Sequence, residues 1–535
     1  MEKVKVKING KTIQVDKGLN IIQAARLIRI EIPHFCYHEA LSIEGNCRMC
    51  LVEIEDQPKL IPACTTQVQE GMSILTNSEK VIESRRSVLE LLLLNHPIDC
   101  PVCDQSGECK LQDYYMQYGL HESRLRDSKI KRAKAKRIGP HVILDQERCV
   151  LCTICIRYCK EIINKQQLGL FQRGDYSYID IYEDQLYDNI YSGNVVDICP
   201  VGALTDLDFR FQCRVWFLNS TESICPRCSR GCNIYIHHQQ NKKYLGNRKR
   251  VFRIKPRFNQ DVNKWWICDL GRYGLNFIDQ KRIQHPKKKQ DKEFIPVSWN
   301  EIYFELSQII KSIIKKDPNK LAIILSPHLT NEELFVCFEF INQLKCSNYH
   351  FSAISTNTYE DNFLINKDKF PNLNGAKLIV KNTLINSTEQ ILEKAKDSAY
   401  KCIYIIGQDL VKMYGKDEIK NILSKTQTVI GQFSNENLTT PLVDFILPSA
   451  TFAEKNGTFI NFDNRIQLIR QAFPPLENTK PDWQIIVELA KELEINIPYK
   501  SEIEIWEKMK SVYKEFHELD YNKIGPLGIK LNITK

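Results

Sequence analysis

The chain lacks the features that would place it in a bilayer or an export pathway. No apolar run approaches the roughly eighteen residues that a membrane-spanning helix needs, and the best run, Val88–Leu94, predicts one short buried helix. The first seven residues, MEKVKVK, carry charges where a signal peptide has its apolar core. We therefore expect a protein of a reducing compartment, in which cysteines do not form disulfides.

Motifs for nucleotides and nucleic acids are also missing. There is no G-x-G-x-x-G and no P-loop, so the sequence gives no evidence for a nicotinamide, flavin or ATP site. The basic runs Lys129–Arg137 and Lys287–Lys289 have no interleaved aromatic residues and no binding motif, which argues against nucleic-acid binding. Each run is consistent with a solvated face or with docking to an acidic partner.

Cysteine, by contrast, is abundant and unevenly distributed. Seventeen of the twenty cysteines lie in the first 268 residues, and three follow, at Cys337, Cys346 and Cys402. A chain of 535 residues can bury several cores, so we expect three to five domains. The distribution predicts a metal-binding half followed by a half without metal.

The first cysteine set follows a predicted hairpin and helix. Residues 3–8 and 11–15 alternate apolar and polar side chains around Asn9-Gly10, a strong hairpin signal. Apolar residues at helical spacing predict a helix over 21–30. This is the opening of a β-grasp ferredoxin, and a 2Fe-2S cluster needs two thiolates for each iron. We predict 2Fe-2S ligation by Cys36, Cys47, Cys50 and Cys64, with structural zinc as the alternative.

A second set has three closely spaced cysteines and a histidine. Three thiolates leave a 4Fe-4S cluster one ligand short. Histidines near helix ends are commonly caps or surface residues, but here the missing ligand favours ligation. A neutral imidazole in place of a thiolate reduces the negative charge and should change the reduction potential. The predicted ligands of this 4Fe-4S cluster are His96, Cys100, Cys103 and Cys109.

The third set spans residues 149–199 and has two possible ligations. The spacing C-x2-C-x2-C-x3-C at Cys149–Cys159 could hold one cluster alone. In two-cluster ferredoxins, however, the fourth cysteine of such a run binds the other cluster. Cys199-Pro200 is the end of a second run whose first three positions hold Asn189, Ser192 and Val195. We therefore predict a second 4Fe-4S site formed by Cys149, Cys152, Cys155 and Cys199, with Cys159 unligated.

A fourth set has the spacing C-x2-C-x3-C-x35-C. Strand-like sequence such as Asn233–His237 lies inside its long gap. The spacing suits a third 4Fe-4S cluster or zinc, and both remain open. Cys213 has no partner at ligand spacing and is predicted to be a core thiol. The candidate ligands are Cys225, Cys228, Cys232 and Cys268.

Beyond residue 275 the pattern becomes an alternation of strands and helices. Such an alternation predicts an α/β layer with a parallel sheet. Buried strands are predicted at Leu321–Leu325, Ala376–Val380, Cys402–Ile406 and Thr428–Ile430. Helices are predicted at Glu332–Leu344, Thr388–Ser398, Asp417–Ser424, Trp483–Leu493 and Glu502–Phe516.

The order of these sets resembles the large iron-sulfur subunit (75 kDa or G-type) of respiratory complex I, NADH:quinone oxidoreductase. The resemblance covers nearly the whole chain. It is carried by Cys36–Cys64, His96–Cys103, Cys199–Thr205 and Leu447–Phe459, and the last stretch looks like molybdopterin oxidoreductases. It implies that the first three sets bind one 2Fe-2S and two 4Fe-4S clusters between flavin and quinone. It also implies that the Cys225 set binds a further 4Fe-4S cluster off this path.

The resemblance to molybdenum enzymes also indicates where their chemistry is missing. Formate dehydrogenases have a lysine two residues after the last cysteine, between cluster and pterin, and this chain has Leu270. The molybdenum ligand would be expected around 351–359, which contains no cysteine, and Cys346 comes too early. The α/β region is also shorter than a complete pterin-binding enzyme needs. We expect a scaffold without molybdopterin or a molybdenum ligand that packs against neighbouring subunits.

The implied fold is multidomain, α+β and α/β. A β-grasp 2Fe-2S ferredoxin is expected at 1–78, followed by a one-histidine three-cysteine 4Fe-4S domain at 79–120 and a ferredoxin-like 4Fe-4S domain at 140–215. A four-cysteine 4Fe-4S domain of molybdopterin-oxidoreductase type is expected at 218–275, and a truncated molybdopterin-oxidoreductase-like α/β domain without metal at 276–535.

The resemblance implies an electron-transfer subunit of a proton-translocating NADH:quinone oxidoreductase, with no complete active site, FMN or NAD of its own. Expected partners are the flavin- and NADH-binding subunit and the quinone-side subunits. The expected location is peripheral, on the cytoplasmic side of a bacterial inner membrane or the matrix side in mitochondria, with membrane contact only through the complex. The alternatives are the iron-sulfur or catalytic subunit of an NAD-linked formate dehydrogenase or hydrogenase, and a zinc-stapled scaffold without a redox role.

Overall fold

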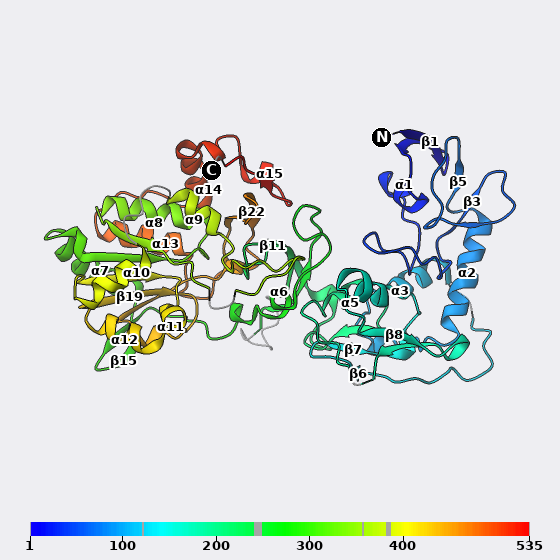
Figure 1. Ribbon diagram of the computed structural model, residues 1–535, viewed down its shortest axis with the longest axis horizontal. Helices are drawn as coiled ribbons and strands as arrows, with labels where there is room; N and C mark the ends of the chain where they lie inside the picture. Colours follow the sequence, from blue (N-terminus) through cyan, green and yellow to red (C-terminus); the bar gives the residue numbers. More distant parts are fainter. Residues whose placement is uncertain are drawn as a thin grey trace. The chain divides into compact units, whose positions relative to one another are not determined.

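The computed structural model describes residues 2–119, 122–183, 185–239, 249–355, 358–380 and 387–533. The contacts divide the chain into two compact units, Met1–Leu218 and Asn219–Lys535. The ranges predicted for the three N-terminal domains fall in the first unit, and 219–535 forms the second (Figure 1). Within the described ranges, no helix combines the length and the apolar character needed to cross a membrane.

The first unit begins with a five-stranded sheet in the order β2-β1-β5-β3-β4. The predicted hairpin is confirmed, because β1 (Lys3–Ile8) pairs antiparallel with β2 (Lys11–Asp16). Asn9 and Gly10 have φ of 46° and 82°, as a type I′ turn requires. The other strands are β3 (Leu51–Ile54), β4 (Ile61–Pro62) and β5 (Ser73–Leu75), and β5 runs parallel to β1.

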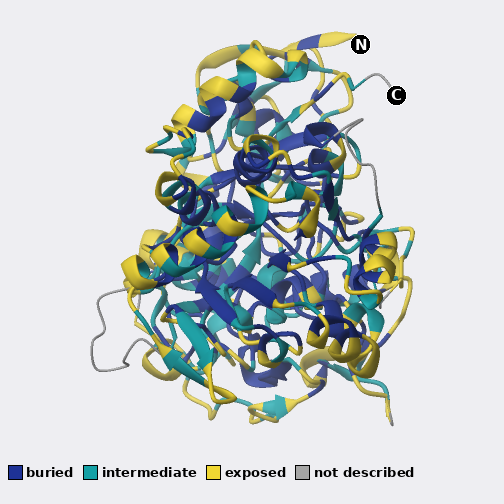
Figure 2. Cartoon of the chain, turned by 90° about the vertical axis from the view of Figure 1, so that its left-hand side faces the viewer, coloured by how far each residue is buried: buried dark blue, intermediate teal, exposed yellow. Residues whose placement is uncertain are grey.

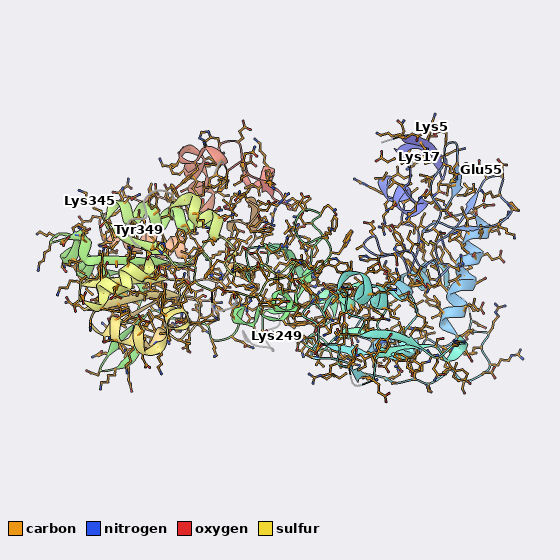
Figure 3. The ribbon with its side chains drawn as sticks, viewed as in Figure 1. Lys5, Lys17, Glu55, Lys249, Lys345 and Tyr349 are labelled. Carbon is orange, nitrogen blue, oxygen red and sulfur yellow. The ribbon has the colours of Figure 1, made fainter. Side chains whose placement is uncertain are left out.

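Helix α1 (Ile21–Leu27) covers this sheet with its buried isoleucine and alanine side chains. Asn20 and Gln23 form a capping box, in which each side chain accepts a hydrogen bond from the other residue's backbone N–H. The helix ends earlier than residue 30. Charged side chains on the sheet and its loops, such as Lys5, Lys17 and Glu55, remain exposed (Figure 3).

The rest of the first unit consists of short elements joined by loops. Its helices are α2 (Glu79–Leu93), α3 (Lys110–Tyr114), α4 (Ile154–Arg157) and α5 (Asn194–Ile198). One small sheet has the order β10-β7-β6, and a hairpin is formed by β8 and β9. These strands are β6 (Lys136–Arg137), β7 (Val142–Leu144), β8 (Leu168–Phe171), β9 (Tyr178–Ile181) and β10 (Leu204–Asp206).

The second unit contains a seven-stranded sheet in the order β15-β14-β20-β19-β18-β16-β17. The five strands from β20 to β17 are parallel, and β14 and β15 form an antiparallel edge. The strands are β14 (Lys287–Gln290), β15 (Glu293–Pro296), β16 (Leu321–Leu325), β17 (Asn348–Phe351), β18 (Cys402–Ile406), β19 (Thr428–Phe433) and β20 (Phe445–Pro448). The predicted strands at 321, 402 and 428 and the parallel α/β layer are therefore confirmed.

Helices cover both faces of this sheet, as parallel sheets require. Alternate residues of β16 contribute to two cores: Leu321 lies in the core with α7, α8, α13 and α14, and Ala322 in the core with α10, α11 and α12. The central strands are dark blue in Figure 2, whereas exposed turns of the helices are yellow. The helices are α7 (Trp299–Ile314), α8 (Asn331–Gln343), α10 (Thr388–Lys396), α11 (Leu410–Tyr414), α12 (Lys416–Ser424), α13 (Asp482–Glu492), α14 (Glu502–Val512) and α15 (Tyr521–Ile524).

The predicted strand at Ala376–Val380 is wrong, because this stretch belongs to helix α9 (Leu373–Ile379). A short apolar run does not distinguish a buried strand from a buried helix by periodicity. Tertiary contacts fix the start of this helix: the Asn372 side chain donates to the Leu329 carbonyl at 2.9 Å and accepts from the Ile460 N–H at 2.7 Å.

Two smaller sheets complete the second unit. The first contains β11 (Asn219–Ile224), β12 (Asn233–His238) and β13 (Val251–Pro256), followed by helix α6 (Asp269–Tyr273). The second contains β21 (Gly457–Ile460), β22 (Arg465–Ile469) and β23 (Ile529–Lys530). The strand predicted at 233–237 is thus confirmed.

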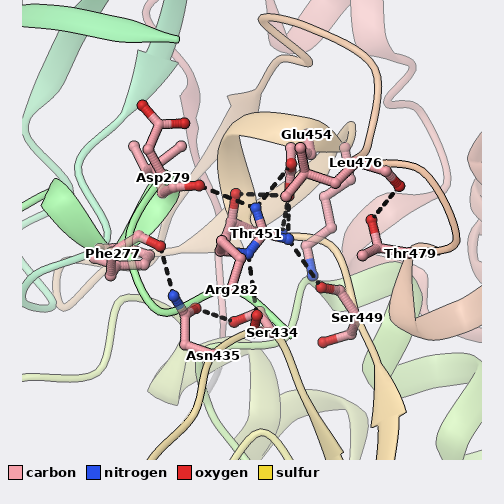
Figure 4. Close-up of polar contacts among 12 residues, drawn as sticks. Phe277, Asp279, Arg282, Ser434, Asn435, Ser449, Thr451, Glu454, Leu476 and Thr479 are labelled. Carbon is pink, nitrogen blue, oxygen red and sulfur yellow. Dashed lines mark hydrogen bonds and ion pairs between the residues drawn. The ribbon is translucent and has the colours of Figure 1, made fainter. Parts of the chain in front are cut away.

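The motif Leu447–Phe459 is a centre of buried charge. Arg282 makes two contacts of 2.8 Å with the Glu454 carboxylate (Figure 4). Arg250 also donates to this carboxylate, at 2.7 Å. Burial alone would raise the pKa of Glu454, but the hydrogen bond and charge of Arg282 and the charge of Arg250 outweigh it, and the pKa is lowered. The next residue, Lys455, lies 2.7 Å from Glu333 and 2.8 Å from Asp482.

Candidate iron-sulfur sites

The first predicted set lies in the loop between α1 and β3 and just after β4. Cys36, Cys50 and Cys64 are buried, and Cys47 is partly exposed. The thiols interact as two pairs: the hydrogen bond from Cys36 lowers the pKa of Cys47 to about 7, and that from Cys50 lowers the pKa of Cys64. The Phe35 N–H also donates to the Cys47 sulfur at 3.4 Å. Two thiol pairs match the two thiolates that each iron of a 2Fe-2S cluster requires.

The second predicted set lies between α2 and α3. Cys103 interacts electrostatically with Cys100 and Cys109, so these three thiols are near one another. The residues that influence the pKa of His96 are instead Asp99, Lys129 and Arg148. The Nδ1 of His96 is nevertheless buried and has no hydrogen-bond partner among the residues that the structure describes.

Burial lowers the pKa of His96 to about 4, which favours a neutral imidazole. A neutral imidazole with an unsatisfied buried nitrogen suits a metal ligand. The case for His96 as a cluster ligand therefore rests on the chemistry of its imidazole nitrogen. Among the described residues there is no direct contact between His96 and the three thiols.

Two basic side chains that no sequence motif linked to His96 contact the segment around it. Lys129 donates to the carbonyls of Leu93 and His96 at 2.6 and 2.9 Å, so it caps the C-terminal end of α2. Arg148 forms a two-pronged ion pair with Asp99 at 2.9 and 2.7 Å. Lys129 begins the run that we interpreted as a solvated face or a docking surface, and its amine instead binds within the unit.

The four predicted ligands of the third set line one small cavity, together with apolar residues such as Leu144 and Ile179. Each of these four thiols interacts with another member of the set, and burial raises the pKa of each. The Leu151 N–H donates to the Cys149 sulfur at 3.4 Å. The cavity is lined by Cys149, Cys152, Cys155 and Cys199.

Cys159 is not among the residues that line this cavity. Its sulfur instead lies 3.9 Å from the hydroxyl of the buried Tyr187. The region in which the sequence predicts the loss of a second cluster contains further buried polar side chains. Asn194 donates to the Tyr158 hydroxyl at 3.0 Å, and Asn189 donates to Gln167 at 2.8 Å.

The second and third sets adjoin each other. A Cβ atom on Gly202 would lie 2.3 Å from the Cys103 sulfur, so any side chain at this position would displace that sulfur. The Lys110 N–H, next to Cys109, donates to the Pro200 carbonyl at 3.0 Å.

The fourth set lies in the second unit, between β11 and α6. The four thiols influence one another electrostatically, and burial raises the pKa of Cys225, Cys232 and Cys268. The Cys225 N–H donates to the Cys232 carbonyl at 2.9 Å, and the Gly271 N–H donates to the Cys268 sulfur at 3.4 Å. Within the described ranges, no three His, Cys, Asp or Glu side chains of any set converge in metal-binding geometry. The thiols of the fourth set therefore lie near one another but do not converge on a common point.

A cavity of about 380 Å³ lies beside the fourth set, where β16, β17 and β18 end. It is lined by Arg227 and Leu270 from the cysteine region and by His328 and Gln408 from the loops that follow β16 and β18. The Cys346 sulfur contacts the Leu321 carbonyl at 3.2 Å, at the opposite end of β16. Residues 356 and 357, within the stretch expected to supply a molybdenum ligand, lie outside the described residues.

Comparison with protein families divides the chain into matching segments. Residues 1–79 match a 2Fe-2S iron-sulfur cluster binding domain, 85–124 the NADH-ubiquinone oxidoreductase-G iron-sulfur binding region, and 139–205 the ferredoxin-like domain of NADH-quinone oxidoreductase subunit 3. Residues 218–280 match the molybdopterin oxidoreductase Fe4S4 domain, and 282–369 and 354–492 match molybdopterin oxidoreductase. The chain is therefore an iron-sulfur protein that joins 2Fe-2S and 4Fe-4S domains to a molybdopterin-oxidoreductase region.

Curated relatives give the more specific classification. The G-type subunit of NADH-quinone oxidoreductase from Rickettsia bellii is 29% identical over 99% of this chain and 93% of its own length. The NADH-ubiquinone oxidoreductase 75 kDa subunit of Reclinomonas americana is 29% identical over 95% of this chain and 91% of its own length. The chain is thus similar over nearly its whole length to these G-type and 75 kDa proteins.

Among solved structures, an NAD+-reducing [NiFe]-hydrogenase in its H2-reduced state is 28% identical, over 40% of this chain and 91% of that chain, with a TM-score of 0.36.

Proposed function

We propose that the chain is the electron-transfer subunit of an NADH-quinone oxidoreductase, relaying electrons from a flavin subunit toward a quinone-reducing subunit. The observation that carries this proposal is the adjacency of three predicted ligand sets within one compact unit. Gly202 brings the third set against the second, and the Asn46 side chain, next to Cys47, donates to the Leu151 carbonyl at 3.2 Å. Electron relay requires such closely spaced sites.

The residues of the chain would supply the environment for this relay. Iron-sulfur clusters accept and release single electrons when bound. The protein buries the thiols, excludes water with apolar side chains such as Leu144, and directs the N–H groups of Phe35 and Leu151 at sulfur. Hydrogen bonds to sulfur and burial are the means by which a protein tunes a cluster's potential.

The proposed cofactors are one 2Fe-2S cluster and two 4Fe-4S clusters in the first unit, with a third 4Fe-4S cluster at the Cys225 set. The five domain boundaries and the ligand sets predicted from the sequence are part of this proposal. So is the absence of molybdopterin, FMN and NAD. Leu270 in the cavity wall and Cys346 at the far end of β16 support the absence of a molybdenum site.

The proposed partners are the flavin- and NADH-binding subunit and the quinone-side subunits. The proposed location is the cytoplasmic or matrix side of the membrane that holds the complex, with the chain attached only through those partners.

Metal analysis after anaerobic purification tests the proposal. One 2Fe-2S and three 4Fe-4S clusters would give about fourteen irons per chain, or about ten if the Cys225 set binds zinc or nothing. Signals from 2Fe-2S and 4Fe-4S clusters should appear by EPR after reduction with dithionite. A colourless, zinc-containing protein would refute the proposal, and stoichiometric molybdenum or tungsten with pterin would favour a formate dehydrogenase instead.

A further inference from the structure

Arg157, at the end of α4, lies between the first and third predicted ligand sets. Its Nη2 donates to the carbonyl of Cys36 at 2.6 Å and to the carbonyl of Cys152 at 3.1 Å. Its Nη1 donates to the Ser42 carbonyl, and its Nε donates to the Thr153 hydroxyl at 3.2 Å. One guanidinium thus binds the backbone of a predicted ligand in each set, across 121 residues of sequence.

This guanidinium is buried and has weak charge compensation from the protein. Only 6% of Arg157 is exposed. Among the described residues, the carboxylate within ion-pair distance of it is that of Glu44, which is 3.9 Å away and has 44% of its side chain exposed. A buried cation costs free energy unless a nearby negative charge compensates it. Iron-sulfur clusters with thiolate ligands carry negative charge, so two bound clusters would provide that compensation.

A purely structural role does not account for this arrangement. The same two loops are also joined at exposed positions, where Asn46 donates to the Leu151 carbonyl and the Ser42 N–H donates to Glu161 at 2.8 Å. Neutral or exposed contacts can therefore hold the loops together. Placing a full positive charge inside the junction adds an electrostatic effect that these contacts lack.

We propose that Arg157 is a positioning residue that fixes the separation of the 2Fe-2S and the second 4Fe-4S sites and raises the reduction potential of both. Reduction adds one negative charge to a site, and the neighbouring guanidinium stabilises that charge. The hydrogen bonds from Nη2 to both carbonyls also hold the predicted ligand loops at one spacing, on which the rate of electron transfer depends. This inference rests on the proposed function.

EPR-monitored redox titration of the full chain tests the role of Arg157. In Arg157→Gln, the iron content should be unchanged. At the wild-type midpoint potential, the ratio of reduced to oxidised centres should fall about tenfold at both sites, which corresponds to about 59 mV for one electron. Arg157→Lys keeps the charge and loses the fork geometry, so we expect a smaller fall. Asn46→Ala removes a neutral contact across the same junction and should leave both potentials unchanged.

Unchanged potentials in Arg157→Gln with all clusters assembled would overturn the inference and leave the proposed function intact. If wild-type protein contains no iron-sulfur clusters, the proposed function itself fails. If Arg157→Gln does not assemble its clusters, Arg157→Lys decides the question through the magnetic coupling of the two EPR signals, which reports their separation. The coupling should weaken in this variant, and unchanged coupling with unchanged potentials would overturn the inference.

Discussion

The choice between Cys159 and Cys199 as fourth ligand is open to a direct test. Cys199 lines the same cavity as Cys149, Cys152 and Cys155, whereas Cys159 lies beside Tyr187. We expect Cys199→Ser to lose one 4Fe-4S cluster, reducing the iron content from about fourteen to about ten per chain. Cys159→Ser should keep the full iron content. The hydroxyl introduced by Cys159→Ser can hydrogen-bond to Tyr187, so this substitution should lower the unfolding free energy by about 1 kcal/mol.

Iron content per chain and EPR spectra of the dithionite-reduced protein provide the assay. Cys213→Ser is the matched control, because Cys213 is also buried and lies outside the four predicted sets. It should retain all clusters. Loss of four irons in Cys159→Ser, with full iron in Cys199→Ser, would refute the assignment. Equal loss in all three variants would indicate a general folding defect.

Three further predictions concern His96, Glu332 and Glu454. His96→Cys should retain its cluster at a lower reduction potential, since a thiolate adds negative charge; an unchanged potential in redox titration would contradict ligation by His96. Burial raises the pKa of Glu332 to about 7, so the contribution of Glu332 to stability should be largest below about pH 4.5 and fall by about 3 kcal/mol as the pH rises to about 7; Glu332→Gln should remove this loss in urea unfolding across pH. Glu454→Gln leaves Arg250 and Arg282 without their shared carboxylate, so it should cost about 3–5 kcal/mol of unfolding free energy. A change below 1 kcal/mol in the same assay would show that this buried ion pair does not stabilise the fold.

Local sequence signals predicted the regular elements well. Asn9-Gly10 fixed the first hairpin, because both residues must have positive φ, and β16 and β18 were recognisable as short apolar runs. The same signal failed at Ala376–Val380, where the apolar run is helical. Strand β14 was not predicted, because it has the sequence KKKQ and its place at the sheet comes from pairing with β15 and β20.

Cysteine spacing proposed the ligand sets, but the contacts around them depend on residues distant in sequence. Neither Lys129 under His96 nor Arg157 between Cys36 and Cys152 follows from any local pattern. In each case a basic side chain binds backbone carbonyls, and such contacts leave no complementary residue type in the sequence. They can be found only after the chain is folded.

A chain that binds no pterin can still resemble molybdopterin oxidoreductases, because the most specific shared motif also stabilises the fold. Within Leu447–Phe459, Glu454 and Lys455 form ion pairs with buried residues from other parts of the second unit. Thr458 likewise donates to Glu332 at 2.9 Å. Breaking one buried ion pair typically costs about 3–5 kcal/mol, a large part of a domain's stability of about 5–15 kcal/mol. Selection for stability alone would therefore preserve this motif, so its presence is not evidence that a pterin binds.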